Sequence, residues 1–324
     1  MTTVLITGVG AIMGYGLLRS LRAAMPEVRL VGTDIFSDAV GQAWCDEFEQ
    51  APLTSSGHYL QWLNDVVEKH HIDLVIPGIE QDVHRLSDER EKISAFNCKF
   101  ALNDALLIDL SRDKWAMHQE LLELGDPSRI PSYLSGDYAS LSTLLNVPFI
   151  LKPRSGYASK GLVKVRSEND FTLEKSRLGE HLMAQPLIGS DDDEFTVGVF
   201  GDGRGNVCAS ISMQRHLSKE GATANAKIVN HESLNEVVSR LCTHFKPIGP
   251  TNLQFRREGL EWKLLEINPR VSSTSSIRTA FGYNEASMCL DFYLNGLLPS
   301  QPAIKNGFAI RFIEDYVVYD RDHF

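Results

Sequence analysis

Short apolar runs alternate with amphipathic stretches along the first third of the chain. Residues 4–6, 30–34 and 72–76 are rich in Val, Ile and Leu, and leucines at helical spacing follow the first run. Residues 59–69 have the pattern of an amphipathic helix. Strands that alternate with helices form parallel sheets covered by those helices. The sequence therefore predicts an N-terminal α/β domain.

The turn after the first predicted strand is rich in glycine. Gly8, Gly10 and Gly14 have the spacing G-x-G-x-x-x-G, and the second predicted strand ends in Asp34. In a Rossmann-like opening, such a turn binds a pyrophosphate and the acid binds a ribose. An NAD(P)-dependent oxidoreductase that uses Gly8, Gly10 and Asp34 is therefore one possible function. The spacing differs from the usual fingerprint, and such openings also occur in folds that bind no dinucleotide.

Two acidic residues, Glu80 and Asp82, follow the third predicted strand. Open α/β sheets bind ligands at the carboxyl ends of their strands, so these side chains could face a substrate. Acids in a first helical turn also stabilise the helix dipole. The sequence leaves both interpretations open.

The middle of the chain predicts a helix over 111–124 with Ser111 as its N-cap. A strand ending in Lys152 then leads into a loop of small residues at 154–161 and another strand at 162–165. The P-loop pattern is absent, and no helix follows the loop. Backbone N–H groups and hydroxyls of such a flap can bind phosphates as an anion nest does.

The last part of the chain is dominated by alternating strand patterns. Strands are expected over residues 194–199, 207–213, 251–255, 264–267, 309–313 and 316–319, and an amphipathic helix over 233–245.

Two of these strands form a predicted hairpin that carries oxygen ligands. Glu266 and Asn268 are two residues apart and therefore share one face of their strand. If the hairpin turns near Leu260, Gln254 lies opposite Glu266 on that face. Mg²⁺ prefers oxygen and is held by one or two carboxylates together with phosphate oxygens. With Arg270 just beyond, the pattern predicts a nucleotide-bound metal site, although an edge strand with a solvated face is the alternative.

The segments NLQF at 252–255 and LLEINPRVSSTSS at 264–276 closely resemble the metal-binding strand pair of ATP-grasp enzymes, particularly the carbamoyl-phosphate synthase large-subunit branch. The resemblance implies an α/β protein with the ATP-grasp fold. Its N-terminal Rossmann-like pre-ATP-grasp domain would cover residues 1–110. A lid subdomain over 111–185 and a C-terminal catalytic lobe over 186–324 would hold ATP between them.

The resemblance also assigns roles to individual residues. ATP would contact Lys114, Lys152, Ser159, Lys160, Gln185, Leu187 and Glu194. The metal, Mg²⁺ or Mn²⁺, would be held by Gln254, Glu266 and Asn268. Catalysis would depend on Arg270, Lys152 and Arg215.

The implied reaction is transfer of a phosphoryl group from ATP to a carboxylate, giving an acyl phosphate that an amine attacks. Carbamoyl-phosphate-synthase-like carboxyphosphate chemistry is an alternative. However, the family's second arginine after N-P-R is replaced by Ser273, and only one ATP-grasp module is recognisable. A stand-alone carboxylate-amine ligase is therefore expected. A nucleotide sensor would not need to keep Glu266 and Asn268 together.

Composition excludes some classes of partner. The net charge of −10 and the absence of a basic run argue against a nucleic-acid surface. No segment has the length of a membrane span, and the N-terminus lacks a signal-peptide pattern. The five scattered cysteines indicate reduced thiols in a cytoplasmic protein. Small-molecule carboxylate and amine substrates are the expected partners, and a homodimer is compatible with the sequence.

Overall fold

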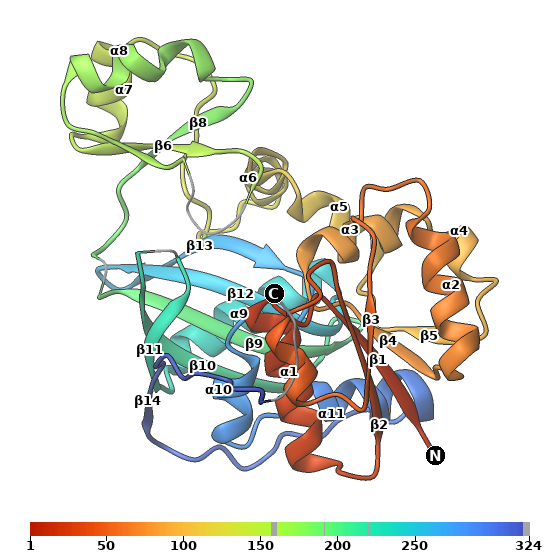
Figure 1. Ribbon diagram of the computed structural model, residues 1–324. Helices are drawn as coiled ribbons and strands as arrows, with labels where there is room; N and C mark the ends of the chain where they lie inside the picture. Colours follow the sequence, from red (N-terminus) through yellow and green to blue (C-terminus); the bar gives the residue numbers. More distant parts are fainter. Residues whose placement is uncertain (157–160, 191, 220, 320–324) are drawn as a thin grey trace.

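The structure is a computed structural model that describes residues 1–156, 161–190, 192–219 and 221–319. Ser159 and Lys160 of the predicted nucleotide-binding set lie outside these ranges. The described strands form three sheets of five, six and three strands. Figure 1 shows the three-stranded sheet and its helices standing apart from the two larger sheets.

The five-stranded sheet is parallel and has the order β3-β2-β1-β4-β5. Its strands are β1 (Thr3–Thr7), β2 (Arg29–Asp34), β3 (Glu47–Gln50), β4 (Leu74–Ile76) and β5 (Lys99–Phe100). Its helical segments are α1 (Ile12–Ala24), η1 (Val40–Ala43), α2 (Tyr59–His70), α3 (Glu80–Asp88), α4 (Arg90–Ile93) and α5 (Ala105–Ser111). The apolar runs are continuous because α1 packs on one face and α2 on the other. The predicted N-terminal α/β domain is confirmed.

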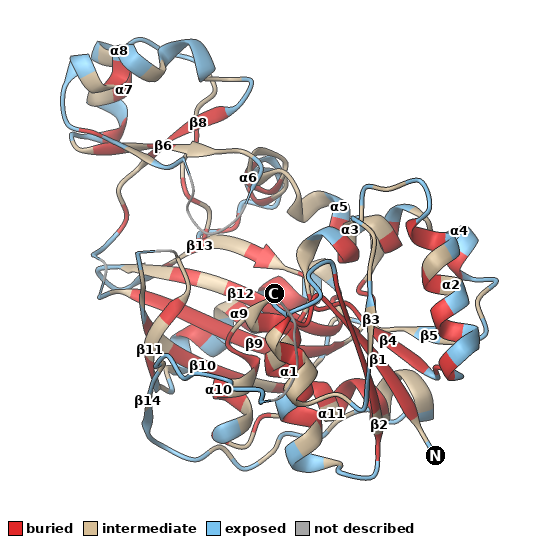
Figure 2. Cartoon of the chain, in the orientation of Figure 1, coloured by how far each residue is buried: buried red, intermediate tan, exposed pale blue. Residues whose placement is uncertain are grey.

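The six-stranded sheet is antiparallel, with the order β13-β12-β9-β10-β11-β14. The strands are β9 (Glu194–Asp202), β10 (Val207–Leu217), β11 (Thr223–Ile228), β12 (Ile248–Glu258), β13 (Glu261–Asn268) and β14 (Phe308–Ile310). The helices are α9 (Glu232–Phe245), α10 (Ser275–Ala280), α11 (Glu285–Cys289) and the π-helix η3 (Leu290–Leu294). Helix α9 packs on one face, while α10 and α11 pack on the other, beside α1. Figure 2 shows buried positions running along the strands of both large sheets.

The three-stranded sheet has the order β7-β6-β8 and a hydrophobic core of its own. It contains β6 (Phe149–Pro153), β7 (Val163–Val165) and β8 (Leu182–Pro186), with α7 (Tyr138–Leu145), α8 (Glu168–Glu174) and η2 (Lys175–Arg177). Helix α6 (Lys114–Glu123) joins it to the N-terminal domain. A separate small core lets this part move as one unit, as a lid requires. The domain boundaries at 110 and 185 remain predictions.

Two expected elements differ from the structure. The helix predicted to start at Ser111 begins at Lys114, because Asp113 accepts a hydrogen bond from the Trp115 amide and caps it. Ser111 instead ends α5. Only β14 forms from the late strand patterns, and 316–319 is an exposed coil. Since β14 is the last strand of its sheet, no described strand beyond it pairs with that segment.

A buried ion pair anchors α10 and α11 to the six-stranded sheet. Arg278 donates to the Glu285 carboxylate at 3.2 Å, and both side chains are fully buried. The same guanidinium bonds Asn252 of β12 and Thr196 of β9. Gly198 leaves room for it, since a Cβ there would lie 2.5 Å from Arg278 Nη1. This network fixes the segment that follows Arg270.

Arg278→Leu is expected to lower the free energy of unfolding by about 3–5 kcal/mol, because Glu285 would remain buried without a counter-charge. The measurement is urea unfolding. Replacing both residues by leucine should restore most of the loss. Arg177→Leu, which breaks an exposed pair with Glu174, is the control and should cost less than about 1 kcal/mol. A single Arg278 variant as stable as this control would contradict the assignment.

Candidate active site

A cavity of about 790 Å³ lies where the three sheets meet. The lid strands β6 and β8 line it from one side, and β9, β12 and β13 line it from another. The loops after β1 and β4 close its end. Every predicted site residue that the structure describes lines this cavity: Lys114, Lys152, Gln185, Leu187, Glu194, Arg215, Gln254, Glu266, Asn268 and Arg270. The structure thus brings the described set together, while the assigned roles remain predictions.

The hairpin of β12 and β13 has the expected register. Gln254 pairs with Glu266 and Asn252 with Asn268, and a bulge follows Gln254. The Asn268 amide nitrogen donates to Glu266 Oε1 at 3.1 Å. Its oxygen accepts from Arg270 Nη2 at 3.1 Å. Glu266, Asn268 and Arg270 therefore form one hydrogen-bonded row along the cavity wall.

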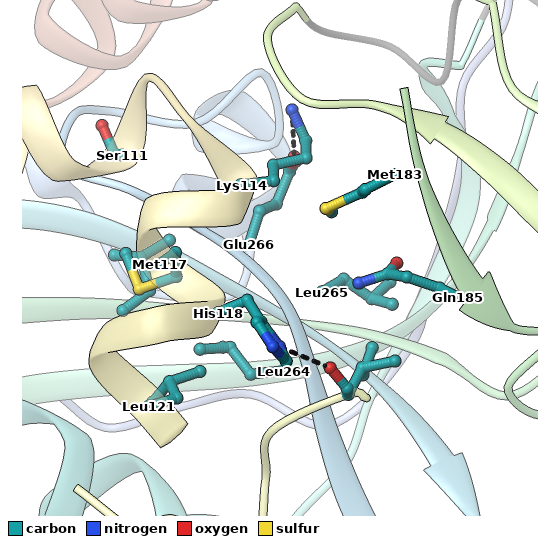
Figure 3. Close-up of a pocket in the computed structure, with 12 residues that line it drawn as sticks. Ser111, Lys114, Met117, His118, Leu121, Met183, Gln185, Leu264, Leu265 and Glu266 are labelled. Atoms are coloured by element: carbon teal, nitrogen blue, oxygen red, sulfur yellow. Dashed lines mark hydrogen bonds and ion pairs between the residues drawn. The ribbon is translucent and has the colours of Figure 1, made fainter. Parts of the chain in front are cut away.

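Two lysines lie beside the Glu266 carboxylate. Lys114 Nζ is 4.0 Å from Glu266 Oε2 and donates to the Gly156 carbonyl at 2.8 Å. Figure 3 shows Lys114 of α6 and Glu266 of β13 pointing toward one another, with Gln185 of β8 nearby. Lys152 Nζ donates to the Leu265 carbonyl at 3.2 Å. The two ammonium groups and the carboxylate make the charged floor of the cavity.

The charges of this floor shift one another's pKa values. Burial alone would raise the pKa of Glu266, but Lys114 and Lys152 outweigh it and hold the pKa below its usual range. Burial lowers the pKa of Lys152 to about 8, against the opposing effect of Glu266. At neutral pH, Glu266 is therefore ionised and Lys152 is protonated. The carboxylate of the floor can therefore bind a metal ion, and its ammonium group can bind phosphate oxygens.

The donor set is suited to Mg²⁺ that also binds phosphates. Glu266 is a carboxylate. The amide oxygens of Gln254 and Asn268 accept from Arg215 and Arg270 and keep a second lone pair for a metal. Within the described residues, no group of three or more His, Cys, Asp and Glu side chains could hold a metal. In a site with one carboxylate, phosphate oxygens and water fill the remaining coordination positions of the metal, and Mg²⁺ readily binds such ligands. The residues present therefore fit the metal that the resemblance implies.

Glu194 of β9 lies between two guanidinium groups. Arg215 Nη2 donates to Glu194 Oε1 at 2.9 Å and to Gln254 Oε1 at 2.6 Å. Arg256 Nη2 lies 3.3 Å from the other oxygen of Glu194. Arg256 was not among the predicted residues, although its position two residues after Gln254 on the same face of β12 is a signal that could have identified it. A carboxylate held on both sides has a fixed orientation and still has lone pairs for ribose hydroxyls.

Gln185 is buried on the lid strand β8. Its amide nitrogen donates to Ser132 Oγ at 2.8 Å. Its oxygen has no partner among the described residues and is the kind of acceptor that an adenine amino group requires. A small hollow of about 20 Å³ lies beside it, between α6 and β13 (Figure 3). The geometry thus fits the predicted adenine contact.

The two acids after β4 face different ways. Glu80 lines the cavity and bonds Arg270 at 2.7 Å. Asp82 is buried in the N-terminal domain and accepts from Thr54 Oγ1 at 2.5 Å. Of these two acids, only Glu80 can therefore contact a substrate in the cavity.

The carboxylate of Asp34 is occupied within the N-terminal domain. It accepts hydrogen bonds from the Gly10 amide at 2.7 Å and the Phe36 amide at 3.1 Å. One oxygen thus stabilises the glycine turn, and the other stabilises the loop that follows β2. A ribose would have to compete with these bonds, which weighs against dinucleotide binding here.

A guanidinium lies against the Ser273 backbone, where the resemblance expects a second arginine. Arg311, which follows β14, donates through Nη2 to the Ser273 carbonyl at 2.8 Å. Its Nη1 is buried without a hydrogen-bond partner in the described structure. No local pattern in the sequence predicts this contact, because the two residues come from different segments that meet only in the fold.

Family profiles match both large parts of the chain. A profile described as "PylC-like, N-terminal domain" matches residues 4–101. Another, described as "ATP-grasp in the biosynthetic pathway with Ter operon", matches residues 180–316. The two matches correspond to the parallel sheet and to the part that carries the hairpin.

Curated relatives include carbamoyl phosphate synthase large chains. That of Methanosarcina mazei is 22% identical over 320 residues, covering 88% of this chain and 29% of the relative. That of Thermoplasma volcanium is 22% identical over 316 residues, covering 90% of this chain and 30% of the relative. The chain thus spans less than a third of the length of these relatives.

Solved structures share the fold at low sequence identity. The biotin carboxylase–β,γ-ATP complex from Campylobacter jejuni has a TM-score of 0.73 at 18% identity, covering 95% of this chain and 74% of that one. N5-carboxyaminoimidazole synthetase from Staphylococcus aureus complexed with ADP has a TM-score of 0.73 at 18% identity, covering 94% and 80%. The chain therefore has the ATP-grasp fold, with a PylC-like N-terminal domain and an ATP-grasp domain related to carbamoyl phosphate synthase large chains.

Proposed function

We propose that this protein is an ATP-dependent carboxylate-amine ligase. It activates a carboxylate as an acyl phosphate, an amine attacks the acyl carbon, and ADP and phosphate leave. The observation that carries this proposal is the row Glu266, Asn268 and Arg270, flanked by Lys114 and Lys152 on the cavity floor. It joins metal ligands, phosphate-binding cations and a carboxylate-binding guanidinium along one wall.

Each side chain has a defined part in this reaction. Gln254, Glu266 and Asn268 would hold Mg²⁺, which neutralises phosphate charge when bound. Lys152 and Lys114 stabilise the negative charge that develops on the transferred phosphoryl group. Gln185, Leu187 and Glu194 hold the nucleoside. Arg270 orients the carboxylate, and Arg215 contacts the acyl phosphate. Closure of the lid excludes water that would hydrolyse the acyl phosphate.

The relatives support this class of chemistry by analogy. The Staphylococcus aureus synthetase binds ADP, and a related carboxylase domain from Hydrogenobacter thermophilus is a dimer that binds MgADP and bicarbonate. A bicarbonate-using synthase is the less favoured alternative, because Ser273 replaces the expected arginine.

We further propose a cytoplasmic location and small-molecule partners. All five cysteines are free, which fits a reducing compartment. No helix in the described part of the chain is long and apolar enough to cross a bilayer. A homodimer remains a prediction.

The experiment is release of ADP and phosphate from Mg-ATP in the presence of pooled carboxylates and amines. Hydroxylamine is added in parallel to trap an acyl phosphate as a hydroxamate. Release that depends on one pool, forms a hydroxamate and stops with EDTA is expected. ATP binding without release from any pool would favour a sensor, and NADPH binding without ATP binding would favour the oxidoreductase.

A further inference from the structure

Arg270 can offer only one edge to a substrate. Nη1 donates to its neighbour's carbonyl, Val271 O, at 3.0 Å, and Nη2 reaches Asn268 at 3.1 Å. The remaining edge, formed by Nε and Nη2, is the fork that binds a carboxylate through two parallel bonds. Glu80 Oε2 now accepts from both of these nitrogens, at 3.2 and 2.7 Å.

A carboxylate of the protein thus occupies the edge that a substrate carboxylate needs. Glu80 comes from the first turn of α3, 190 residues before Arg270. It uses one oxygen for both bonds, and its Oε1 accepts no hydrogen bond from the described residues. Both side chains line the cavity and remain partly accessible, at 25% for Glu80 and 17% for Arg270. The pair is therefore accessible to a ligand in the cavity.

The two other basic groups of the described structure that belong to this cluster, His84 and Arg112, are not free to neutralise Glu80 once its bond to Arg270 opens. Burial lowers the pKa of His84 below its ordinary value although Glu80 opposes this, so the imidazole is mainly neutral at pH 7. Arg112 is held by Asp88 at 2.7 Å. A plain carboxylate on Arg270 would therefore leave two anions competing for one guanidinium.

A ligand that brings its own positive charge avoids this repulsion. We propose that the carboxylate substrate is an amino acid, whose carboxylate binds Arg270 and whose ammonium group binds Glu80. The original ion pair then opens into two ion pairs without leaving an unpaired charge. This assignment rests on the proposed function, because it names the substrate class of the same site.

The position of the pair suits the reaction. Arg270 Nη2 donates to Asn268, which in turn donates to Glu266, so the Nε/Nη2 edge adjoins the predicted metal ligands. Glu80 reaches this same edge from helix α3 of the N-terminal domain. Glu80 is therefore a specificity-determining residue that selects against carboxylates lacking an amino group.

The test compares ligands that differ only in the amino group. Binding to the full-length protein with Mg-ADP is measured by calorimetry for each standard amino acid and β-alanine, and for the matching carboxylate without the amino group. At least one amino acid should bind about tenfold to a hundredfold more tightly than its counterpart, the value of one charge-assisted hydrogen bond. No such preference in any pair, including no binding at all, overturns the proposal.

Glu80→Gln should abolish this preference while changing ADP affinity less than about twofold, because Glu80 is not among the residues predicted to contact the nucleotide or its metal. Glu91→Gln is the matched control, since it removes one carboxylate from an exposed position of the next helix, α4, outside the cavity. If Glu80→Gln weakened binding of the amino acid and of its counterpart without the amino group equally, Glu80 would have a structural role and the proposal would be overturned. Phosphate release is read separately. Preferential binding without turnover would support the amino-acid site and contradict the ligase function.

Discussion

Glu266→Gln is expected to lower kcat/KM for ATP turnover by about 100- to 1000-fold while the protein stays folded. Glutamine keeps the size of the side chain and can still accept the bond from Asn268. It removes the one carboxylate of the predicted metal set and the anion beside Lys114 and Lys152. The measurement is steady-state ADP release at several Mg²⁺ concentrations, and the apparent affinity for Mg²⁺ should also fall.

Glu261→Gln provides a matched control on the same strand. Glu261 is exposed and pairs with Lys263 at 2.6 Å, outside the cavity. This variant should have wild-type kinetics and stability. If Glu266→Gln retained turnover within tenfold of wild type, the metal assignment would be wrong. If it unfolded at lower urea than the control, its kinetics would have to be compared below that transition.

The hairpin could be predicted from sequence because its rules are local. Alternation places Glu266 and Asn268 on one face. The turn pairs Glu258 with Glu261, and the bulge after Gln254 brings that residue opposite Glu266. The structure has that register, with Gln254 paired to Glu266. The N-terminal α/β domain was predictable for a similar reason, since its apolar runs and helical spacing lie within about 110 residues.

Contacts between distant segments could not be predicted in this way. Neither the approach of Glu80 to Arg270 nor that of Arg311 to Ser273 leaves a local pattern. Such pairs depend on how whole domains pack. The predicted helix start at Ser111 was wrong because Asp113 competes with Ser111 as the N-cap. The strand predicted over 316–319 was wrong because apolar alternation forms a strand only where a neighbouring strand can pair with it.

Replacing Lys152 by methionine is expected to lower kcat by about 100- to 1000-fold, because the cation that neutralises the transferred phosphoryl group is lost. The wild type should also lose kcat/KM as the pH rises through about 8, where the free protein's Lys152 deprotonates. The sign follows from the chemistry, because only the protonated amine attracts phosphate. Bound nucleotide favours the charged form, so the decline in kcat should come at higher pH than the decline in kcat/KM.

Lys152→Arg separates the charge from other causes of an alkaline decline. Arginine stays protonated throughout the range, so the loss of kcat/KM near pH 8 should disappear, even if the maximal rate is lower because the longer side chain fits less well. The comparison is a pH profile of ADP release for the wild type and the arginine variant from pH 6 to 10, with stability checked at each pH. An identical alkaline limb in both proteins would show that another group titrates there, and Lys152 would then contribute to the cavity floor through packing and hydrogen bonding alone.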